Sequence, residues 1–384
     1  MVSTSAIAPA LIEKILAAPQ QRLTFADYMD WLLYDPNYGY YATGQVGIGQ
    51  KGDFFTASSL GSDFGELLAE QFREMWLNLA QPTSFNLVEM GAGTGILAQD
   101  ILSYYQNNYP DFFESLQFII IEKSFHLQSL QKKNLENFQG KVNWQEWENI
   151  AENSLVGCFF SNELVDAFPV HLVTVSEGKL KEIYVTYEQG CLRETIAEFS
   201  SLELESYFSL NQLDFTADIY PSGYRTEVNL MAYDWLKTVT QKLKQGYVLT
   251  IDYGYSAEKY YHPQRSQGTL QCYYQHRYHS DPYVNLGKQD ITAHVNFTAL
   301  ENWGKIFGLD CLAFTQQGLF LMNLGLGDHL TELSSGKFKL PEIFQRRDAL
   351  HQLIDPTGLG RFGVLLQAKG LDSEEARSLR GFAI

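Results

Sequence analysis

The run from Leu87 to Ile96, Leu-Val-Glu-Met-Gly-Ala-Gly-Thr-Gly-Ile, constrains the fold more than any other part of the chain. Apolar residues surround the acid Glu89, and three glycines follow at alternate positions, at 91, 93 and 95. Glycine lets the backbone turn sharply where a strand ends and lets a ligand lie directly against the main chain. The apolar residues after the turn recur at helical spacing. The run therefore predicts a strand, a ligand-binding turn and a helix.

The spacing of the glycines indicates which ligand the turn binds. A dinucleotide-binding turn has the pattern G-x-G-x-x-G, which needs a glycine where Ile96 stands. The pattern here is G-x-G-x-G, with an acid two residues before the first glycine, as in class I methyltransferases that use S-adenosylmethionine. Glu89 is expected to face the ammonium group of this cofactor. The next apolar run, 118–121, ends in Glu122, which is placed to bind ribose hydroxyls.

Composition limits the classes of protein to which the chain can belong. Its 384 residues, 45% of them hydrophobic, suffice for one large α/β domain with insertions or for two domains. The formal net charge of −17 argues against a nucleic-acid binder, because phosphate neutralisation needs a basic surface, and suits a basic partner better. The four cysteines form no C-x-x-C pair, and His276 and His279 have no evident third ligand, so no metal site is predicted.

Neither a membrane span nor a targeting segment is expected. No apolar run reaches the roughly 18 residues that a transmembrane helix needs. The segment Met1–Ala10 lacks a basic stretch before an apolar core, and the first arginine is Arg22. We therefore expect a soluble cytoplasmic protein without membrane insertion.

The order of elements predicts an α/β fold with a doubly wound, Rossmann-like sheet. Helices are expected before the glycine turn at 6–17, 25–34 and 64–79, with Thr24 as a cap for the second. Beyond Glu122 the expected elements are a helix at 124–138 and strands at 142–147, 156–161 and 246–254. Strands that alternate with helices are typical of a parallel sheet, whose ligands bind at the carboxyl ends of the strands.

From Pro169 onward the pattern changes to alternating polar and apolar residues. It predicts antiparallel strands at 170–176, 180–187 and 192–196, then helices at 202–210 and 228–243. We therefore divide the chain into N-terminal helices with a cofactor-covering loop at 1–80, the first part of the methyltransferase core at 81–170, an inserted β-rich and helical substrate subdomain at 171–225, and the second part of the core with C-terminal elements at 226–384.

Polar side chains after the fourth expected strand are candidates for the site. Asn162, Glu163 and Asp166 should lie above the cofactor at the carboxyl end of the sheet. The alternative is a helix start, in which Asn162 is the cap and the acids lie in the first turn. Asp53, in a glycine-rich loop, could close over the cofactor or form a solvated turn. Asp252, after the fifth strand, could face the pocket or make an Asx turn.

Six segments, taken in order, resemble the MidA family of methyltransferases. They are GDFFTA at 52–57, FGEL at 64–67, EMGAGTG at 89–95, NELVDAFPV at 162–170, IDYG at 251–254 and DITAHVNF at 290–297. Each segment is short, but their order makes the match specific, and the resemblance extends from about Phe25 to Leu366. The chain departs from the family pattern at positions that flank the expected substrate entrance: Ser58, Ser59, Thr94, Leu164 and Val165.

The resemblance implies a methyltransferase that uses S-adenosylmethionine and modifies an arginine on a partner protein. The family acts in mitochondria in respiratory complex I assembly, so a subunit of an NADH-dehydrogenase-type complex is the implied partner. The residues expected to bind the cofactor are Asp53, Glu89, Gly91, Gly93, Gly95, Glu122 and Asn162.

Arginine methylation requires carboxylates that hold the planar guanidinium group and localise its charge, so that one nitrogen becomes the nucleophile. Glu163 is the first choice for this contact and Asp166 the second. His294 could accept a proton near neutral pH or be a structural histidine. Three tyrosines could stack on the adenine, cover the acceptor or only pack: Tyr38, Tyr40 and Tyr41.

Three classes of function stay open from the sequence. The first is a protein arginine methyltransferase. The second is a methyltransferase for a small molecule or RNA, because the fold binds the cofactor without fixing the acceptor. The third is an assembly chaperone without catalysis. The sequence does not indicate an oligomeric state.

Overall fold

The structure is a computed structural model, and it describes residues 7–44, 56–211, 213–215, 219–275, 277–371 and 379–383. Asp53, which was expected to bind the cofactor, lies outside these ranges. So do His276 and the first four residues of the segment at 52–57.

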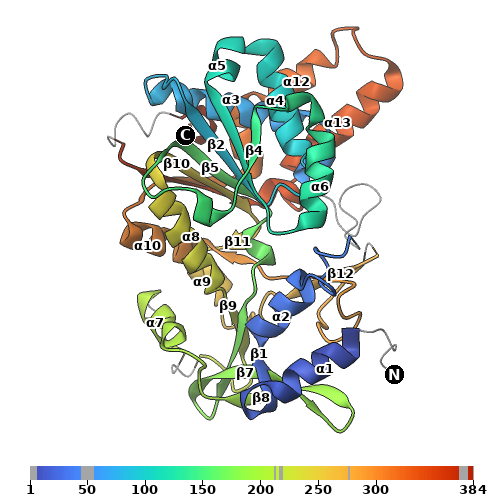
Figure 1. Cartoon of the computed structure of the whole chain (residues 1–384), viewed down its shortest axis with the longest axis vertical. Helices are drawn as coiled ribbons and strands as arrows, with labels where there is room; N and C mark the ends of the chain where they lie inside the picture. The colour runs from blue at the N-terminus through green and yellow to red at the C-terminus, as the bar shows by residue number, and fades with distance from the viewer. Residues whose placement is uncertain are drawn as a thin grey trace.

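A seven-stranded sheet with the strand order β16-β17-β10-β5-β2-β3-β4 forms one end of the molecule (Figure 1). The parallel strands are β2 (Phe85–Met90), β3 (Leu116–Ile121), β4 (Val142–Trp144), β5 (Leu155–Asn162) and β10 (Leu243–Asp252). Strand β17 (Gly363–Lys369) is antiparallel to both β10 and β16 (Asp310–Gln316). The strand order reverses between β2 and β5. Ligands of doubly wound sheets bind at such a point, so the predicted α/β fold is confirmed and the site is placed above these two strands.

Helices cover both faces of this sheet, because both faces of a parallel sheet are apolar. The elements over one face are α3 (Asp63–Asn78), α4 (Ile96–Asn108), α5 (Pro110–Ser115), α11 (Gln317–Leu324), α12 (Leu326–Glu332) and α13 (Leu340–Ile354). Phe72 of α3 packs on Phe160 of β5 with ring centroids 4.8 Å apart. The opposite face packs against α8 (Met231–Lys242) and α10 (Phe297–Phe307). The glycine turn is therefore anchored on a core with two packed faces.

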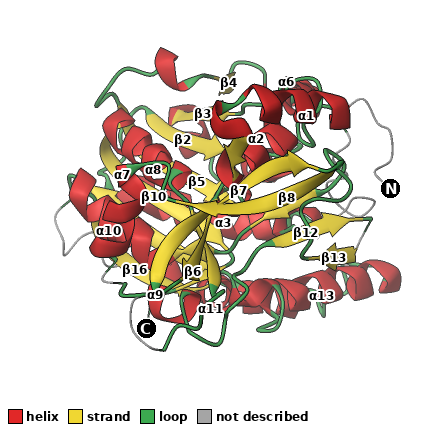
Figure 2. Cartoon of the chain, turned by 90° about the horizontal axis from the view of Figure 1, so that it is seen from below, coloured by secondary structure: helices red, strands yellow, loops and turns green. Residues whose placement is uncertain are grey.

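A second sheet is antiparallel and five-stranded. Figure 2 views the molecule from the end at which this sheet lies. Its strands are β1 (Arg22–Thr24), β6 (His171–Ser176), β7 (Lys179–Glu188), β8 (Cys191–Ala197) and β9 (Arg225–Val228). The helices α1 (Ile7–Ala17) and α2 (Phe25–Tyr34) share a core with this sheet and with the small sheet of β12 (Gln271–Tyr274), β13 (Arg277–His279) and β14 (Asp290–Thr292). Three distant parts of the chain thus build this end of the molecule. The division into four chain segments stays a prediction.

One expected helix boundary is wrong, and so is the alternative of a helix that starts at Asn162. The helix expected at 228–243 begins at Met231, because Val228 is the last residue of β9 and pairs with His171 of β6. No helix begins at Asn162, which is the last residue of β5, and only a short 3-10 turn follows at Val165–Ala167. Asp166 lies in this 3-10 turn, and the buried carboxylate of Asp252, not the side chain of Asn162, accepts the backbone N–H groups of Val165 and Asp166.

Two further features concern the sheet's surroundings. The helix α6 (Phe125–Asn134) follows β3 and begins with Ser124 as its cap. On the other side, Asp63 of α3 holds Arg346 of α13 through contacts of 2.6 and 2.9 Å and His329 of α12 at 2.5 Å. This network fixes the position of α13, whose C-terminal end lies at the site described below. In the part of the chain that the structure describes, no helix is long and apolar enough to cross a membrane.

Candidate active site

A cavity lies above the glycine turn, at the carboxyl ends of β2, β3 and β5; we call it the glycine-turn cavity. The residues that line it include Tyr34, Tyr41, Ser58, Glu89, Gly91, Gly93, Thr94, Glu122, Asn162, Glu163 and Leu164. The backbone at Gly91, Gly93 and Gly95 has positive φ, at 71°, 54° and 82°. A side chain is strained there, and a Cβ at Gly91 would lie only 2.7 Å from Cδ1 of Leu164. The turn therefore needs glycine for both conformation and space.

Two buried acceptor atoms at one side of the glycine-turn cavity have no hydrogen-bond partner among the described residues. They are Oε2 of Glu89 and Oδ1 of Asn162. Burial, with the nearby charge of Glu122, raises the pKa of Glu89 to about 8. A carboxylate and an amide oxygen left unpaired in a cavity are costly unless a donor fills it, and a cation with N–H groups fits both atoms.

Glu122 lies at the end of β3, and its two carboxylate oxygens are held by separate contacts. Oε1 accepts the N–H of Ser124 at 2.9 Å, and Oε2 accepts a bond from Nε2 of Gln131 at 3.0 Å. Burial nevertheless raises the pKa of Glu122. Because each carboxylate oxygen can accept a second bond, the group is oriented to receive a pair of hydroxyl groups.

A second cavity opens beside the first; we call it the acidic cavity. It is lined by Tyr41, Glu163, Asp166, Tyr253, Tyr273, Asp290, His294, Asp355 and Arg361, among others. Tyr41 and Glu163 line both cavities. A ligand in each would therefore meet at these two side chains.

Glu163 has an unusual backbone. Its φ is +52°, a value that residues other than glycine rarely adopt. Its backbone N–H donates to the carbonyl of Ile251 at 2.9 Å. Its Oε1 accepts bonds of 3.3 Å from the N–H of Ala57 and from Nδ2 of Asn162. Burial and the neighbouring Asp166 raise the pKa of Glu163 to about 8. The surrounding structure thus holds this carboxyl group where the two cavities meet, although its backbone is strained and its charge is buried.

Asp166 is also buried at this junction. Its Oδ2 accepts a hydrogen bond of 2.5 Å from the hydroxyl of Tyr253, whereas Oδ1 has no partner among the described residues. Burial raises the pKa of Asp166 to about 6. Asp290 lies across the cavity, where its Oδ1 accepts a hydrogen bond of 2.8 Å from Tyr41. Three carboxylates therefore surround the acidic cavity near its junction with the other cavity.

Comparisons with known proteins agree on one family. The family model described as "Putative S-adenosyl-L-methionine-dependent methyltransferase" matches residues 67–315, more than half of the chain. This chain belongs to that methyltransferase family. A crystal structure of a Burkholderia thailandensis superfamily member bound to S-adenosylhomocysteine is 31% identical, with a TM-score of 0.86 over 98% of this chain and 94% of that one.

Curated relatives of this methyltransferase are named protein arginine methyltransferase NDUFAF7, mitochondrial. The Drosophila melanogaster homologue is 26% identical over 95% of this chain and 85% of its own length. The human protein is 27% identical over 88% of this chain and 78% of its own length. The chain is therefore an S-adenosylmethionine-dependent methyltransferase, and the residues of the glycine-turn cavity fit that cofactor. The unpaired acceptors of Glu89 and Asn162 suit its ammonium group, and Glu122 suits the ribose hydroxyls.

The predicted site residues are distributed between the two cavities of this methyltransferase. The described residues expected at the cofactor line the glycine-turn cavity, apart from Gly95, which forms the turn beneath it: Glu89, Gly91, Gly93, Glu122 and Asn162. The expected catalytic residues, Glu163, Asp166 and His294, line the acidic cavity together. Their roles stay predictions.

The surroundings of His294 do not suit a general base that titrates near neutral pH. Burial, with the positive charge of Arg361 nearby, lowers the pKa of His294 to about 4. Its ring stacks on Tyr255 with centroids 5.0 Å apart, and its Nδ1 has no partner among the described residues. The imidazole is therefore neutral at pH 7 and can accept a hydrogen bond but binds a proton weakly.

Several residues at the site were not singled out from the sequence. Asp290 and Tyr253 lie in the segments DITAHVNF and IDYG, so the resemblance already contained a signal for them. Gln131 on α6 gave no signal, because one polar residue on a helix is indistinguishable from a surface residue. Of the departures from the family pattern, Ser58, Thr94 and Leu164 line the glycine-turn cavity.

Proposed function

We propose that this methyltransferase modifies an arginine side chain of a partner protein. The observation that carries the proposal is the buried carboxylate of Glu163, which faces both the cofactor cavity and a cavity lined by further acids. A guanidinium group is cationic and planar, and carboxylates bind it with high geometric specificity. The names of the relatives, which are arginine methyltransferases, support the same acceptor.

The chemistry assigned to these residues is positioning and charge localisation. The bound cofactor supplies an electrophilic methyl group on a sulfonium sulfur. Glu163 and the unpaired Oδ1 of Asp166 hold the guanidinium group and direct one nitrogen toward the first cavity. The nitrogen held in this way would accept the methyl group that the cofactor supplies, and the sulfur would keep the bonding electron pair. The nitrogen then releases a proton, for which Glu163 is the nearest acceptor we assign.

Burial also makes these acids selective for a cationic ligand. Without a ligand, burial raises the pKa of Asp166 to about 6, and burial together with the neighbouring charge of Asp166 raises that of Glu163 to about 8. A guanidinium cation between them compensates both charges. A neutral acceptor would leave them uncompensated, which disfavours a neutral small molecule.

The partner that we propose is a protein, and a subunit of an NADH-dehydrogenase-type complex is the first candidate. The relatives carry the name NDUFAF7, and their names assign them to mitochondria. For this chain we propose a cytoplasmic location and no nucleic-acid partner. The net charge of −17 supports a basic protein partner over RNA.

Two alternatives are separated from this proposal by one experiment. Purified protein and labelled S-adenosylmethionine are incubated with a lysate of cells that lack the protein, and labelled bands are analysed by mass spectrometry. The proposal predicts label on an arginine of one protein, and no label with Gly93→Val. Label on RNA or on a small molecule supports the second class of function. Cofactor binding without any labelled product supports an assembly chaperone.

A further inference from the structure

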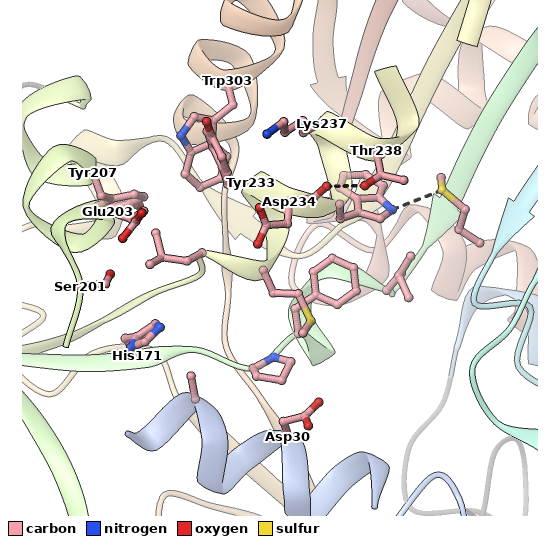
Figure 3. A pocket seen from close by; sticks show the side chains of 18 of the residues that line it. Asp30, His171, Ser201, Glu203, Tyr207, Tyr233, Asp234, Lys237, Thr238 and Trp303 are labelled. Carbon is pink, nitrogen blue, oxygen red and sulfur yellow. Dashed lines mark hydrogen bonds between the residues drawn. The ribbon is translucent and has the colours of Figure 1, made fainter. Parts of the chain in front are cut away.

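A groove with a volume of about 1430 Å³ lies between the two ends of the molecule, separate from the acidic cavity. It is bordered by α2, α7 (Leu202–Leu210), α8 and α10, and by the ends of β2 and β3. Figure 3 shows α2 with Asp30, α7 with Glu203 and α8 with Asp234 on different sides of the opening. The groove reaches the glycine-turn cavity, because Tyr34, Gly91, Glu122 and Leu164 line both.

Large apolar side chains are exposed around this groove. Leu202 on α7 is 75% exposed, Ile306 on α10 is 57% exposed and Met231 on α8 is 38% exposed. The floor between them is apolar as well, with Phe168 and Trp303 among its residues. Apolar side chains that gather around one concave surface from three separate helices are typical of a protein-binding site, where a partner covers them.

The charged side chains around the groove are mostly acidic. Glu203, Asp234 and Asp27 line it without an ion-pair partner in the described ranges. Asp30 is paired with Lys123 at 3.2 Å, and His171 lies 2.8 Å from the buried carboxylate of Glu182. Lys237 is the cation in the lining that has no ion pair among the described residues. The balance therefore favours a ligand with more positive than negative charges.

We propose that this groove docks a segment of the partner protein that carries an apolar stripe flanked by lysine or arginine side chains. The apolar stripe covers Leu202, Met231 and Ile306, and the basic side chains approach Glu203 and Asp234. This inference rests on the proposed function, since it concerns how the same protein partner is held. Docking here places the partner beside the cofactor cavity, with which the groove shares lining residues.

The first test uses a defined probe that does not depend on the identity of the partner. A fluorescent peptide of about 14 residues, with leucine at helical spacing and lysine elsewhere, is titrated with the full-length protein, and the same peptide with glutamate in place of lysine is the control. We expect the lysine peptide to bind and the glutamate peptide to bind about tenfold more weakly. Equal binding of the two peptides would overturn the charge assignment.

Two groove variants and two matched controls locate the binding surface. Leu202→Gln/Ile306→Gln and Glu203→Gln/Asp234→Asn are each expected to weaken the lysine peptide about fivefold to tenfold. Leu319→Gln/Leu340→Gln and Glu136→Gln/Glu205→Gln change exposed side chains of the same types outside the groove and should leave binding unchanged. All four change exposed residues, so thermal unfolding is expected to stay within a few degrees of the parent. Equal effects of groove and control variants contradict the proposal, and so does a dimer in solution that only the groove variants disrupt.

The second test uses the labelled protein found in the lysate experiment. The groove variants should raise its KM about fivefold and leave both S-adenosylmethionine affinity and kcat unchanged. An unchanged KM would contradict the docking inference but would leave the methyltransferase assignment intact. Absence of any arginine label, by contrast, sinks the proposed function, while the peptide titration still decides whether the groove binds basic apolar segments.

Discussion

The two cavities that share Glu163 are assembled in different ways. The glycine-turn cavity contains one continuous run of lining residues between 89 and 97, to which the ends of β3 and β5 and a few N-terminal residues add single side chains. The acidic cavity combines the ends of β5 and β10, the small sheet of β12 and β14, and the segment 352–362. A continuous motif therefore marks the cofactor site in the sequence, whereas the acceptor site is assembled from short segments that lie far apart in the chain. If the two cavities act as separate units, a substitution in one should leave the ligand affinity of the other unchanged.

Gly93→Val should have the largest effect. The substitution places a β-branched side chain at a φ of 54° in the lining of the cofactor cavity. We expect the affinity for S-adenosylmethionine, measured by calorimetry, to fall about 100-fold or more. Gly178→Val is the matched control, because Gly178 has a φ of 71° in a hairpin turn with no atom near its Cβ position. Comparable loss of binding in the control would show that backbone strain, and not the cavity, is responsible.

Glu89→Gln should weaken S-adenosylmethionine about 30-fold, because an unpaired buried carboxylate loses its charge. In the parent protein, the affinity for S-adenosylmethionine should also depend on pH. The pKa of Glu89 is about 8, so below that pH a proton must leave before a cation can bind. Parent affinity is therefore expected to fall as pH drops from 8 to 6, and the variant is expected to lose most of this dependence. An identical pH profile in both proteins would remove Glu89 from the ammonium contact.

Asp166→Asn tests the acidic cavity alone. The unpaired Oδ1 stays an acceptor or becomes a donor, but the negative charge is lost, so the KM for the labelled protein substrate should rise about tenfold. The affinity for S-adenosylmethionine should stay within about twofold, since Asp166 does not line the cofactor cavity. If cofactor affinity falls as much as substrate affinity, the two cavities do not act separately.

The smallest effect concerns stability without ligands. The pKa values of Glu89 and Glu163 are raised from an ordinary 4.5 to about 8, so between these values the folded protein binds more protons than the unfolded chain. These two groups therefore make the protein less stable as pH rises from 5 to 8, whereas His294, with its lowered pKa, acts in the opposite direction below about pH 6.5. We expect a loss of at least about 1 kcal/mol in chemical denaturation, reduced in Glu89→Gln/Glu163→Gln. An identical pH dependence of stability in the parent and in Glu89→Gln/Glu163→Gln would contradict the burial of these carboxylates.

The same contrast explains how much could be predicted from the sequence. The strand, glycine turn and helix at 85–108 were predicted correctly, because hydrophobic period and glycine spacing are local signals. The hairpins of β6, β7 and β8 were predicted for the same reason. The predicted start of α8 was wrong. An apolar residue such as Val228 fits a strand or a helix equally well, and only its pairing with β6 assigns it to a strand.

The acceptor site could be predicted only in part. Glu163 and Asp166 were identified from their place after a strand, but Asp290 reaches them through a long connection that no local pattern encodes. The low pKa of His294 follows from burial and from Arg361, which is far away in sequence. The role of Asp252 in holding the backbone of Val165 and Asp166 likewise depends on the neighbouring strand.

In the proposed function the methyl donor and the acceptor arginine meet at Glu163, and Glu163→Gln tests this most directly. The measurement is a single-turnover experiment in which the protein, preloaded with labelled S-adenosylmethionine, is mixed with the protein substrate, and label on arginine is followed over time. Glutamine keeps the size of the side chain and the Oε1 acceptor for Ala57 and Asn162, so cofactor affinity should stay within about twofold of the parent. The transfer rate should fall about 100-fold or more, since one carboxylate both orients the guanidinium group and accepts its proton. A transfer rate equal to that of the parent would contradict the account.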